Sequence, residues 1–297
     1  MHTDKLLPLG IEEIMQLKEL YRLGKENLSR HSIEAPALEA YILLSKSEVI
    51  KDLSEVYTYP EKEIDRDGFN KFQKLLERRI KREPAAYIRG EKEFYSRSFK
   101  VNASVLIPRP ETELLVDETL DIARQTPSPL ILEIGTGSGC IAVTLACEHE
   151  NVRIVASDVS KEALSVAKEN TKRYEQNQRI SLIRGDLLSS FKNEIFDIIA
   201  SNPPYISEAE FATLEPDVKQ FEPRASLVAG EDGLYYIREI ISGSKRTLKE
   251  GGWCVLEIGH AQRERVECLF NEYGFTEISS AKDLNGTHRV VKAKWKK

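Results

Sequence analysis

The sequence lacks the run of about 20 apolar residues that a membrane-spanning helix requires. It also lacks an N-terminal basic region followed by an apolar run, which is typical of a secretory signal. Its four cysteines form neither a CxxC pair nor a Cys/His spacing typical of zinc. From these absences we expect a cytoplasmic protein without a membrane association or a metal site, in which the cysteines are buried small apolar residues.

An excess of basic residues is absent as well. Lys and Arg number 43 against 48 Asp and Glu, which gives a formal charge of −5. Dedicated DNA-binding proteins usually carry a basic excess, because neutralising phosphates drives their affinity. We therefore expect no stable nucleic-acid binding, although a local basic patch stays open. The content of 41% hydrophobic and 31% charged residues is typical of a chain that folds around a core.

The chain of 297 residues is long enough for two domains. Residues 1–85 predict a small helical domain, with helices over 11–21, from Pro36 to about residue 44, and over 69–80. Its one basic cluster indicates either a solvated helix end, where cations complement the helix dipole, or a contact with an anionic partner; it comprises Arg78, Arg79, Lys81 and Arg82.

Residues 86–107 are rich in β-forming side chains and predict a β-hairpin linker, with a turn at Asn102. Strands and helices alternate over 108–297, which is typical of a doubly wound α/β sheet. The gap around Gly286 is too short for a crossover helix, so the last two strands are expected to be antiparallel. We predict a mostly parallel sheet with seven strands over 129–134, 152–157, 179–184, 196–201, 251–258, 275–280 and 288–294.

A glycine-rich loop follows the first of these strands, before a helix from Cys140 to about His149; it reads Gly135-Thr136-Gly137-Ser138-Gly139. Glycines allow a sharp turn and the close approach of a ligand at the carboxyl edge of the sheet. A dinucleotide fingerprint would need Gly or Ala at position 140. The glycine spacing instead resembles the S-adenosylmethionine loop of class I methyltransferases. The alternative is a tight turn without a ligand.

Acidic residues stand at the ends of the neighbouring strands. Asp158 can accept hydrogen bonds from both ribose hydroxyls, or it can cap the next helix. In the methyltransferase interpretation Asp186 accepts from the adenine amino group and Leu187 covers the ring; the alternative is a surface turn. Glu133 and Val159, at the ends of the first and second strands, and Asn202, which follows the fourth strand, complete the predicted cofactor site.

The most specific motif, Ser201-Asn202-Pro203-Pro204-Tyr205, follows the apolar fourth strand. The prolines end the strand rigidly. An amide or ring amino nitrogen is a poor nucleophile, because its lone pair is delocalised. Two acceptors, the Asn202 side-chain carbonyl and the Pro203 backbone carbonyl, would orient its two N–H bonds and stabilise the charge that develops on methylation. Tyr205 would pack on the planar group and exclude water.

These motifs resemble the methyltransferases that act on planar nitrogens, and within them the HemK/PrmC family. The segments that carry the narrower resemblance cover nearly the whole chain; they are 83–90, 93–95, 107–113, 222–224, 230–234, 257–259 and 283–289. The resemblance implies a methyl transfer from S-adenosylmethionine to the glutamine amide in the GGQ motif of class-1 peptide chain release factors. It also implies a class I fold whose N-terminal domain recognises the partner.

Arg109-Pro110-Glu111-Thr112 matches the release-factor branch, whereas ribosomal-protein L3 glutamine methyltransferases usually carry P-R-S-P there. The resemblance implies that Arg109, Pro110 and Thr112 lie beside the cofactor and the target glutamine. By the residues alone, Thr112 can cap a helix and Arg109 can form an ion pair.

Three further functions stay open. The same motif would serve an L3 glutamine methyltransferase or a nucleic-acid amino-methyltransferase acting on adenine N6, although the latter must flip its base and usually needs a positive surface. A binding module that holds the cofactor without catalysis is the third, and the intact Asn202 motif argues against it. We expect the protein to act as a monomer.

Overall fold

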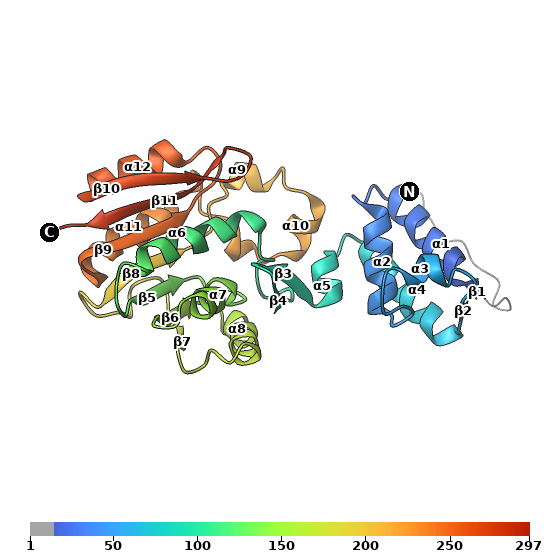
Figure 1. Ribbon diagram of the computed structural model, residues 1–297. Coiled ribbons are helices and arrows are strands. Elements are labelled where there is room, and N and C mark those ends of the chain that lie inside the picture. Colours follow the sequence, from blue (N-terminus) through green and yellow to red (C-terminus); the bar gives the residue numbers. More distant parts are fainter. Residues whose placement is uncertain (1–14) are drawn as a thin grey trace. The chain divides into compact units, whose positions relative to one another are not determined.

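The computed structural model describes residues 15–297, which fall into two compact units that divide between Arg89 and Gly90. Figure 1 labels their elements. Each unit has its own hydrophobic core, one formed by the N-terminal helices and the other on the two faces of a large sheet.

The smaller unit is helical, as the sequence predicts. Its elements are β1 (Met15–Gln16), α1 (Leu17–Arg30), α2 (Pro36–Lys46), α3 (Glu55–Thr58), β2 (Glu63–Ile64), α4 (Arg66–Ile80) and α5 (Ala85–Arg89). The first helix begins at Leu17, because the two preceding residues pair with β2 in a short antiparallel ladder. Residues 11–14 of the predicted helix lie outside the described residues.

Local chemistry explains the other helix boundaries. Pro36 occupies the first turn of α2, where its missing N–H is not needed. The Asp65 side chain caps α4 by accepting from the Gly68 backbone N–H at 2.7 Å. The buried side chains of Leu20, Phe72 and neighbouring apolar residues then pack the helices together.

The basic cluster at the end of α4 is bound within the chain. Arg79 is only 5% exposed and its guanidinium pairs with Glu39 at 3.0 Å. Arg78 pairs with Glu83, and Arg82 donates to the His31 carbonyl at 2.9 Å. The expectation of a solvated helix end is therefore wrong for Arg79, because its charge is neutralised by a carboxylate on α2.

The hairpin consists of β3 (Glu91–Phe94) and β4 (Arg97–Lys100), and it belongs to the larger unit. Its turn lies at Tyr95 and Ser96, which have φ of 50° and 57°. Asn102 forms a separate turn, in which its side chain accepts from the Ser104 N–H. The segment 86–107 is thus divided: its first residues form α5, and no residue after Lys100 within it lies in a strand.

The larger unit contains a seven-stranded sheet with the order β10-β11-β9-β8-β5-β6-β7, which runs from top to bottom in Figure 1. Strand β11 runs antiparallel to the other six strands of this sheet, so the predicted fold class is confirmed. The strands are β5 (Leu130–Ile134), β6 (Arg153–Asp158), β7 (Ile180–Arg184), β8 (Phe196–Ser201), β9 (Leu248–Glu257), β10 (Phe275–Lys282) and β11 (His288–Trp295).

Helices cover both faces of the sheet, as in doubly wound folds. Successive strand residues face opposite sides, so Ile131 packs with α6, α7 and the hairpin, while Leu132 packs with α11 and α12. The helical segments are η1 (Pro110–Thr112), α6 (Glu113–Ala123), α7 (Cys140–Glu148), α8 (Lys161–Arg173), α9 (Glu208–Phe211), α10 (Pro216–Phe221), η2 (Arg224–Ser226), α11 (Tyr235–Thr247) and α12 (Arg263–Glu272).

The strand order reverses between β5 and β8. The chain builds β5, β6 and β7 toward one side and then returns to place β8 on the other side of β5. Ligands of such sheets bind outside the carboxyl ends of the strands at this switch point. The two loops that leave β5 and β8 therefore define the part of the molecule in which a site is expected.

Other sequence expectations have mixed outcomes. Cys140 and Cys254 are buried, whereas Cys147 is half-buried and Cys268 is exposed, so the expectation of four buried cysteines is only partly right. Among residues 15–297 no helix is both long and apolar enough to cross a membrane.

Candidate active site

The two predicted motifs meet at the switch point. The Ser201 hydroxyl at the end of β8 donates to the Ile134 carbonyl at the end of β5 at 2.8 Å, and both residues are buried. This bond brings the loop that begins at Gly135 beside the motif that begins at Asn202. The structure thus places together two segments that are separated by more than 60 residues in the sequence.

The glycine loop leaves open space on one side. Gly135, Gly137 and Gly139 all have positive φ, between 54° and 80°. A Cβ at Gly135 or Gly137 would meet no atom within 4 Å, whereas at Gly139 it would lie 3.2 Å from the Ala167 Cβ on α8. The first two glycines therefore line a free edge, and the third permits close packing of the loop on a helix.

The Glu133 side chain is hydrogen-bonded to the glycine loop and to the first turn of α7. It is fully buried, and its Oε2 accepts from the Thr136 hydroxyl at 2.8 Å and from the Ala142 N–H at 3.1 Å. Burial raises the pKa of Glu133 to about 8, and the charge of Asp158 adds to this. Ser138 lies in the same loop, and its buried carbonyl accepts from Asn170 at 2.8 Å.

Asp158 joins the glycine loop to the next helix. One carboxylate oxygen accepts from the Gly137 N–H and the other from the Ser160 N–H, both at 2.9 Å. Ser160 itself caps α8 by accepting from Ala163, so the alternative of Asp158 as the helix cap is wrong. The ribose role of Asp158 stays a prediction.

The remaining predicted cofactor residues lie next to Asp158. Val159 is apolar yet 60% exposed, and its carbonyl accepts from the Arg184 guanidinium at the end of β7. Asp186 is exposed in the loop that follows, and Leu187 is half-buried with a φ of 47°. An acidic and an apolar side chain at the ends of two neighbouring strands suit a ribose and a flat ring. Their adenine contacts stay predictions.

Asn202 is hydrogen-bonded to Thr112, which lies 90 positions earlier in the chain. The Asn202 Nδ2 donates to the Thr112 hydroxyl at 3.1 Å, and Thr112 is only 3% exposed. Thr112 does not cap α6 with its side chain, contrary to the alternative considered from the sequence. Pro203 is buried and Pro204 half-buried, which fixes the backbone beyond Asn202.

A buried carboxylate lies behind Thr112 and Tyr205. Glu257 is the last residue of β9, and its Oε1 accepts from the Tyr205 hydroxyl at 3.5 Å. Burial raises the pKa of Glu257 to about 7, and burial together with the Glu257 charge raises the pKa of Tyr205. Two hydrogen-bonded pairs, Asn202 with Thr112 and Tyr205 with Glu257, therefore bring together residues of η1 and of the segments at the ends of β8 and β9.

Arg109 has its charge engaged by the protein. Its guanidinium pairs with Glu222, whose side chain is 1% exposed and which also accepts from the Ile107 N–H. The ion pair considered from the sequence is thus present. Pro110 is exposed at the start of η1. The segment from Arg109 to Thr112 is anchored at both ends, and its substrate contacts stay predictions.

Sequence reasoning did not assign a role to several residues of this site. In the sequence, Glu257 and Glu222 stand out only as matches to the family pattern, and Gln262 belongs to no motif. The Gln262 amide donates to the Tyr205 carbonyl at 2.9 Å and so holds the end of the motif. A charged residue that ends a buried apolar strand, as Glu257 does, is a signal that could have found it.

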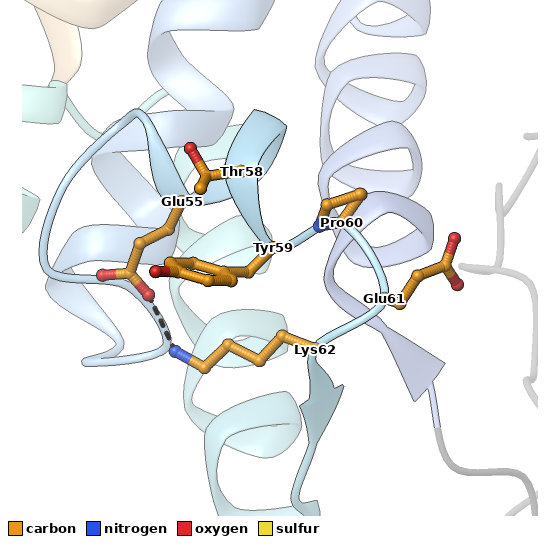
Figure 2. A pocket seen from close by; sticks show the side chains of 6 residues that line it. All are labelled: Glu55, Thr58, Tyr59, Pro60, Glu61 and Lys62. Atoms are coloured by element: carbon orange, nitrogen blue, oxygen red, sulfur yellow. Dashed lines mark hydrogen bonds and ion pairs between the residues drawn. The ribbon is translucent and has the colours of Figure 1, made fainter.

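Two surface hollows are lined by other residues. One, of about 550 Å³, is in the smaller unit (Figure 2), and its lining residues are Glu55, Thr58, Tyr59, Pro60, Glu61 and Lys62. Figure 2 shows Lys62 turned to the Glu55 carboxylate, with which it forms an ion pair at 2.9 Å. The other is lined by residues of α11 and α12. Neither is lined by a predicted site residue.

Comparison with known proteins agrees with this geometry. Residues 110–216 match the methyltransferase small domain, and residues 19–90 match the PrmC N-terminal domain. The catalytic domain of hMettl16, solved in complex with a MAT2A 3′UTR hairpin, has a TM-score of 0.57 and 18% identity; the match covers 73% of this chain and 81% of that one. The fold is that of a class I S-adenosylmethionine-dependent methyltransferase.

Closer relatives define the family. The release factor glutamine methyltransferase of Nitratidesulfovibrio vulgaris is 38% identical over 94% of this chain and 95% of the relative. The bifunctional methyltransferase of Rickettsia prowazekii is 38% identical over 93% of this chain, which spans only 56% of that longer relative. The chain belongs to the release factor glutamine methyltransferase family.

Proposed function

We propose that the protein transfers a methyl group from S-adenosylmethionine to the side-chain amide nitrogen of the glutamine in the GGQ motif of class-1 peptide chain release factors. The products are N5-methylglutamine and S-adenosylhomocysteine. The observation that carries this proposal is the orientation of Asn202, whose NH2 group is bound by Thr112. Its carbonyl oxygen is thereby left to accept from an N–H of the substrate amide.

The residues around the glycine loop fit the cofactor. A free edge at Gly135 and Gly137 allows close approach of a ligand to the backbone, and Asp158 stands at the same edge. The exposed side chain of Val159 and the nearby Leu187 offer apolar surface for a base. The cofactor would supply an electrophilic methyl group on its sulfonium.

The contribution of the chain to the reaction is positioning and electrostatics. The Asn202 side-chain carbonyl and the Pro203 backbone carbonyl would accept from the two N–H bonds of the amide and direct its nitrogen toward the methyl group. Partial positive charge that develops on this nitrogen is stabilised by the same two dipoles. Tyr205 would pack on the plane of the amide, and the methylated nitrogen becomes acidic enough to lose its proton afterwards.

The partner is accordingly a class-1 release factor. We assign its recognition to the helical domain, together with contacts to Arg109, Pro110 and Thr112. The Arg78–Arg82 cluster contributes little to this, because its arginines are engaged within the chain. The protein would work in the cytoplasm, as a monomer, on a substrate of the translation machinery.

The first test is transfer of radiolabelled methyl from S-adenosylmethionine to purified class-1 release factor. A copy in which the GGQ glutamine is replaced serves as the matched control. We expect label on the wild-type factor and none on the replaced copy. Label on neither, with label on ribosomal protein L3 or on nucleic acid, would contradict the proposed substrate and keep the cofactor.

A further inference from the structure

The proposed function needs the Tyr205 ring at one fixed place, because the ring packs on the plane of the target amide. A tyrosine side chain turns about only two bonds, so a fixed backbone goes far toward fixing the ring. The Tyr205 hydroxyl adds little, since its bond to Glu257 is long, at 3.5 Å. The place of the ring therefore depends on what holds the Tyr205 backbone.

The side-chain amide of Gln262, just before α12, holds this backbone. Its NH2 group donates to the Tyr205 carbonyl at 2.9 Å and to the Gly233 carbonyl at 3.1 Å. Its oxygen accepts from the Gly259 N–H at 2.9 Å. Gln262 is only 8% exposed. One nearly buried side chain thus joins three loops that lie far apart in the sequence.

These bonds use both donors of the Gln262 amide. An amide NH2 group has two N–H bonds, and a backbone carbonyl accepts from each of them. Methionine has nearly the same reach as glutamine but no donor, and an ionised glutamate has none either. Neither of these residues could therefore hold the Tyr205 carbonyl in the same way.

Two glycines allow the loops to approach Gln262 closely. A Cβ on Gly233 would lie 2.5 Å from the Tyr205 carbonyl oxygen and 2.8 Å from the Gln262 Nε2. A Cβ on Gly259 would lie 3.1 Å from the Gln262 Oε1 and 3.4 Å from the Tyr205 Cδ2. The Gly259 backbone therefore passes beside the Tyr205 ring as well as beside the amide that holds it.

The chain just beyond Tyr205 has anchors of its own. The Ile206 N–H donates to the Leu227 carbonyl at 2.9 Å, and the Ala229 N–H donates to the Ile206 carbonyl at 2.8 Å. Loss of the Gln262 side-chain bonds should therefore loosen Tyr205 locally and leave the next residues of the loop in place.

We propose that Gln262 is a positioning residue, which holds the Tyr205 backbone against the loops at Gly233 and Gly259 and so fixes the Tyr205 ring beside the target amide. This inference rests on the proposed function, because it deepens the role of Tyr205 in it. Without these bonds the ring can shift, and a shift of about 1 Å in a group that orients a reacting atom can cost up to about 100-fold in rate.

Steady-state kinetics of the full chain with release factor test the proposal. Gln262→Met keeps the reach of the side chain but removes its donors, so we expect kcat to fall about tenfold. The affinity for S-adenosylmethionine, measured by calorimetry, should stay within a few-fold, because Gln262 bonds none of the predicted cofactor residues.

Gln176→Met is the matched control. The Gln176 amide also donates to a backbone carbonyl, that of Tyr174 at 2.9 Å, but it lies before β7 at the amino edge of the sheet. This variant should keep the kcat of the wild type. An equal fall of kcat in Gln176→Met and Gln262→Met would show a general structural effect and overturn the positioning role.

A second variant disturbs the same contact without removing a hydrogen-bonding group. Gly259→Ala directs a methyl group at the Gln262 Oε1 and at the Tyr205 ring. It should therefore lower kcat about threefold or more, again with little change in the affinity for S-adenosylmethionine. If Gln262→Met does not fold, this variant still decides the matter. A wild-type kcat in Gly259→Ala would contradict the proposal.

A double-mutant cycle shows whether Gln262 acts through the Tyr205 ring. Once Tyr205→Ala has removed the ring, the addition of Gln262→Met should lower kcat by less than about twofold. Residues that act independently would instead show the same loss in both backgrounds. An equal loss in the wild type and in Tyr205→Ala would overturn the proposed route.

The Tyr205 ring can also be observed without a substrate, which separates this inference from the proposed function. Its signals in 13C-tyrosine-labelled protein, assigned by their loss in Tyr205→Phe, should shift in Gln262→Met and in Gly259→Ala but not in Gln176→Met. Such shifts in a protein that does not methylate release factor would overturn the substrate and keep the role of Gln262. Ring signals that stay unchanged in Gln262→Met and Gly259→Ala would overturn that role, whatever the substrate.

Discussion

At the residue scale, the proposed role of Asn202 depends on one group, its side-chain carbonyl, which would accept a hydrogen bond from the substrate amide. Its NH2 group is bound to Thr112, so the side chain is oriented before a substrate arrives. Preorganised dipoles of this kind act where charge develops in the transition state and need no rearrangement at that moment. The orientation makes the contribution of Asn202 specific to turnover rather than to cofactor binding.

Asn202→Ala should therefore lower kcat by about 100-fold or more, because one of two stabilising acceptors is lost. The affinity for S-adenosylmethionine should remain within a few-fold. Radiolabel transfer and calorimetry on the same preparation measure the two quantities. Near-normal turnover would show that the proposed role is wrong.

Asp158 should instead contribute to the affinity for S-adenosylmethionine. Its two oxygens already hold the Gly137 and Ser160 N–H groups, and an asparagine can keep only one of these acceptors. Asp158→Asn is expected to weaken cofactor binding about tenfold, in line with the loss of one charge-assisted hydrogen bond. Calorimetry checks this, with the exposed neighbour Glu162→Gln as control. Equal affinities of the two variants would contradict the assignment.

At the scale of the elements, the glycines of the loop serve two purposes: Gly139 allows close packing on α8, and Gly135 leaves space for a ligand. Gly139→Ala places a Cβ 3.2 Å from Ala167 on α8 at a φ of +80°, so it adds steric conflict to backbone strain. Gly135→Ala meets no atom within 4 Å at a φ of +73°, so it adds strain alone, about 1 kcal/mol. Gly139→Ala should therefore lower mainly the stability of the fold, whereas Gly135→Ala should lower mainly the affinity for the cofactor.

We therefore expect Gly139→Ala to lower the free energy of unfolding by about 2–3 kcal/mol, clearly more than Gly135→Ala does. Gly135→Ala should weaken cofactor binding more strongly than its small loss of stability suggests, since the new methyl group projects into the free edge. Urea denaturation and calorimetry on both variants measure this. Two variants with the same loss of stability would contradict the packing role of Gly139.

The hairpin shows how tertiary contacts select a local conformation. Tyr95 and Ser96 take the positive φ values of a tight hairpin turn, although neither is glycine. The Tyr95 N–H donates to Glu113 at 2.7 Å and its hydroxyl to Asp117 at 2.8 Å, both on α6. These two bonds offset the strain, so the turn lies at Tyr95 and not at Asn102.

At the scale of the whole molecule, the buried carboxyls make stability depend on pH. Glu133 and Glu257 have pKa values raised by burial to about 8 and about 7, above their ordinary value of 4.5. Between the ordinary pKa of 4.5 and these raised values, the folded state therefore binds more protons than the unfolded state. Their contribution to stability is complete below about pH 4.5 and is lost as the pH rises through 7 and 8.

Glu133→Gln should flatten this dependence, because glutamine does not titrate. The variant should lose less free energy of unfolding between pH 5 and pH 8 than the wild type, by up to about 1.4 kcal/mol per pH unit. Urea denaturation at three pH values measures the slopes. The exposed Glu272→Gln is the control and should follow the wild type; a Glu133→Gln slope equal to that of the wild type would contradict the burial argument.

The amino-acid sequence by itself determined the elements and the chemical identity of the motifs. Apolar periodicity predicted the helices from Pro36 and after Gly68, and the short gap at Gly286 predicted the antiparallel end of the sheet. The glycine loop and the Asn202 motif could be recognised because they depend on sterics and hydrogen-bonding groups within a few residues. Such local preferences act in the same way wherever the segment lies in the fold.

Only the tertiary structure decided which of these residues meet. Thr112 bonds Asn202 across 90 positions of the chain, and Arg109 pairs with Glu222 across 113. Neither contact leaves a periodicity or a spacing in the sequence, because each arises from the order in which strands enter the sheet. The burial of Glu257 has the same origin: a glutamate is ordinarily exposed, and only the elements packed around β9 remove it from water.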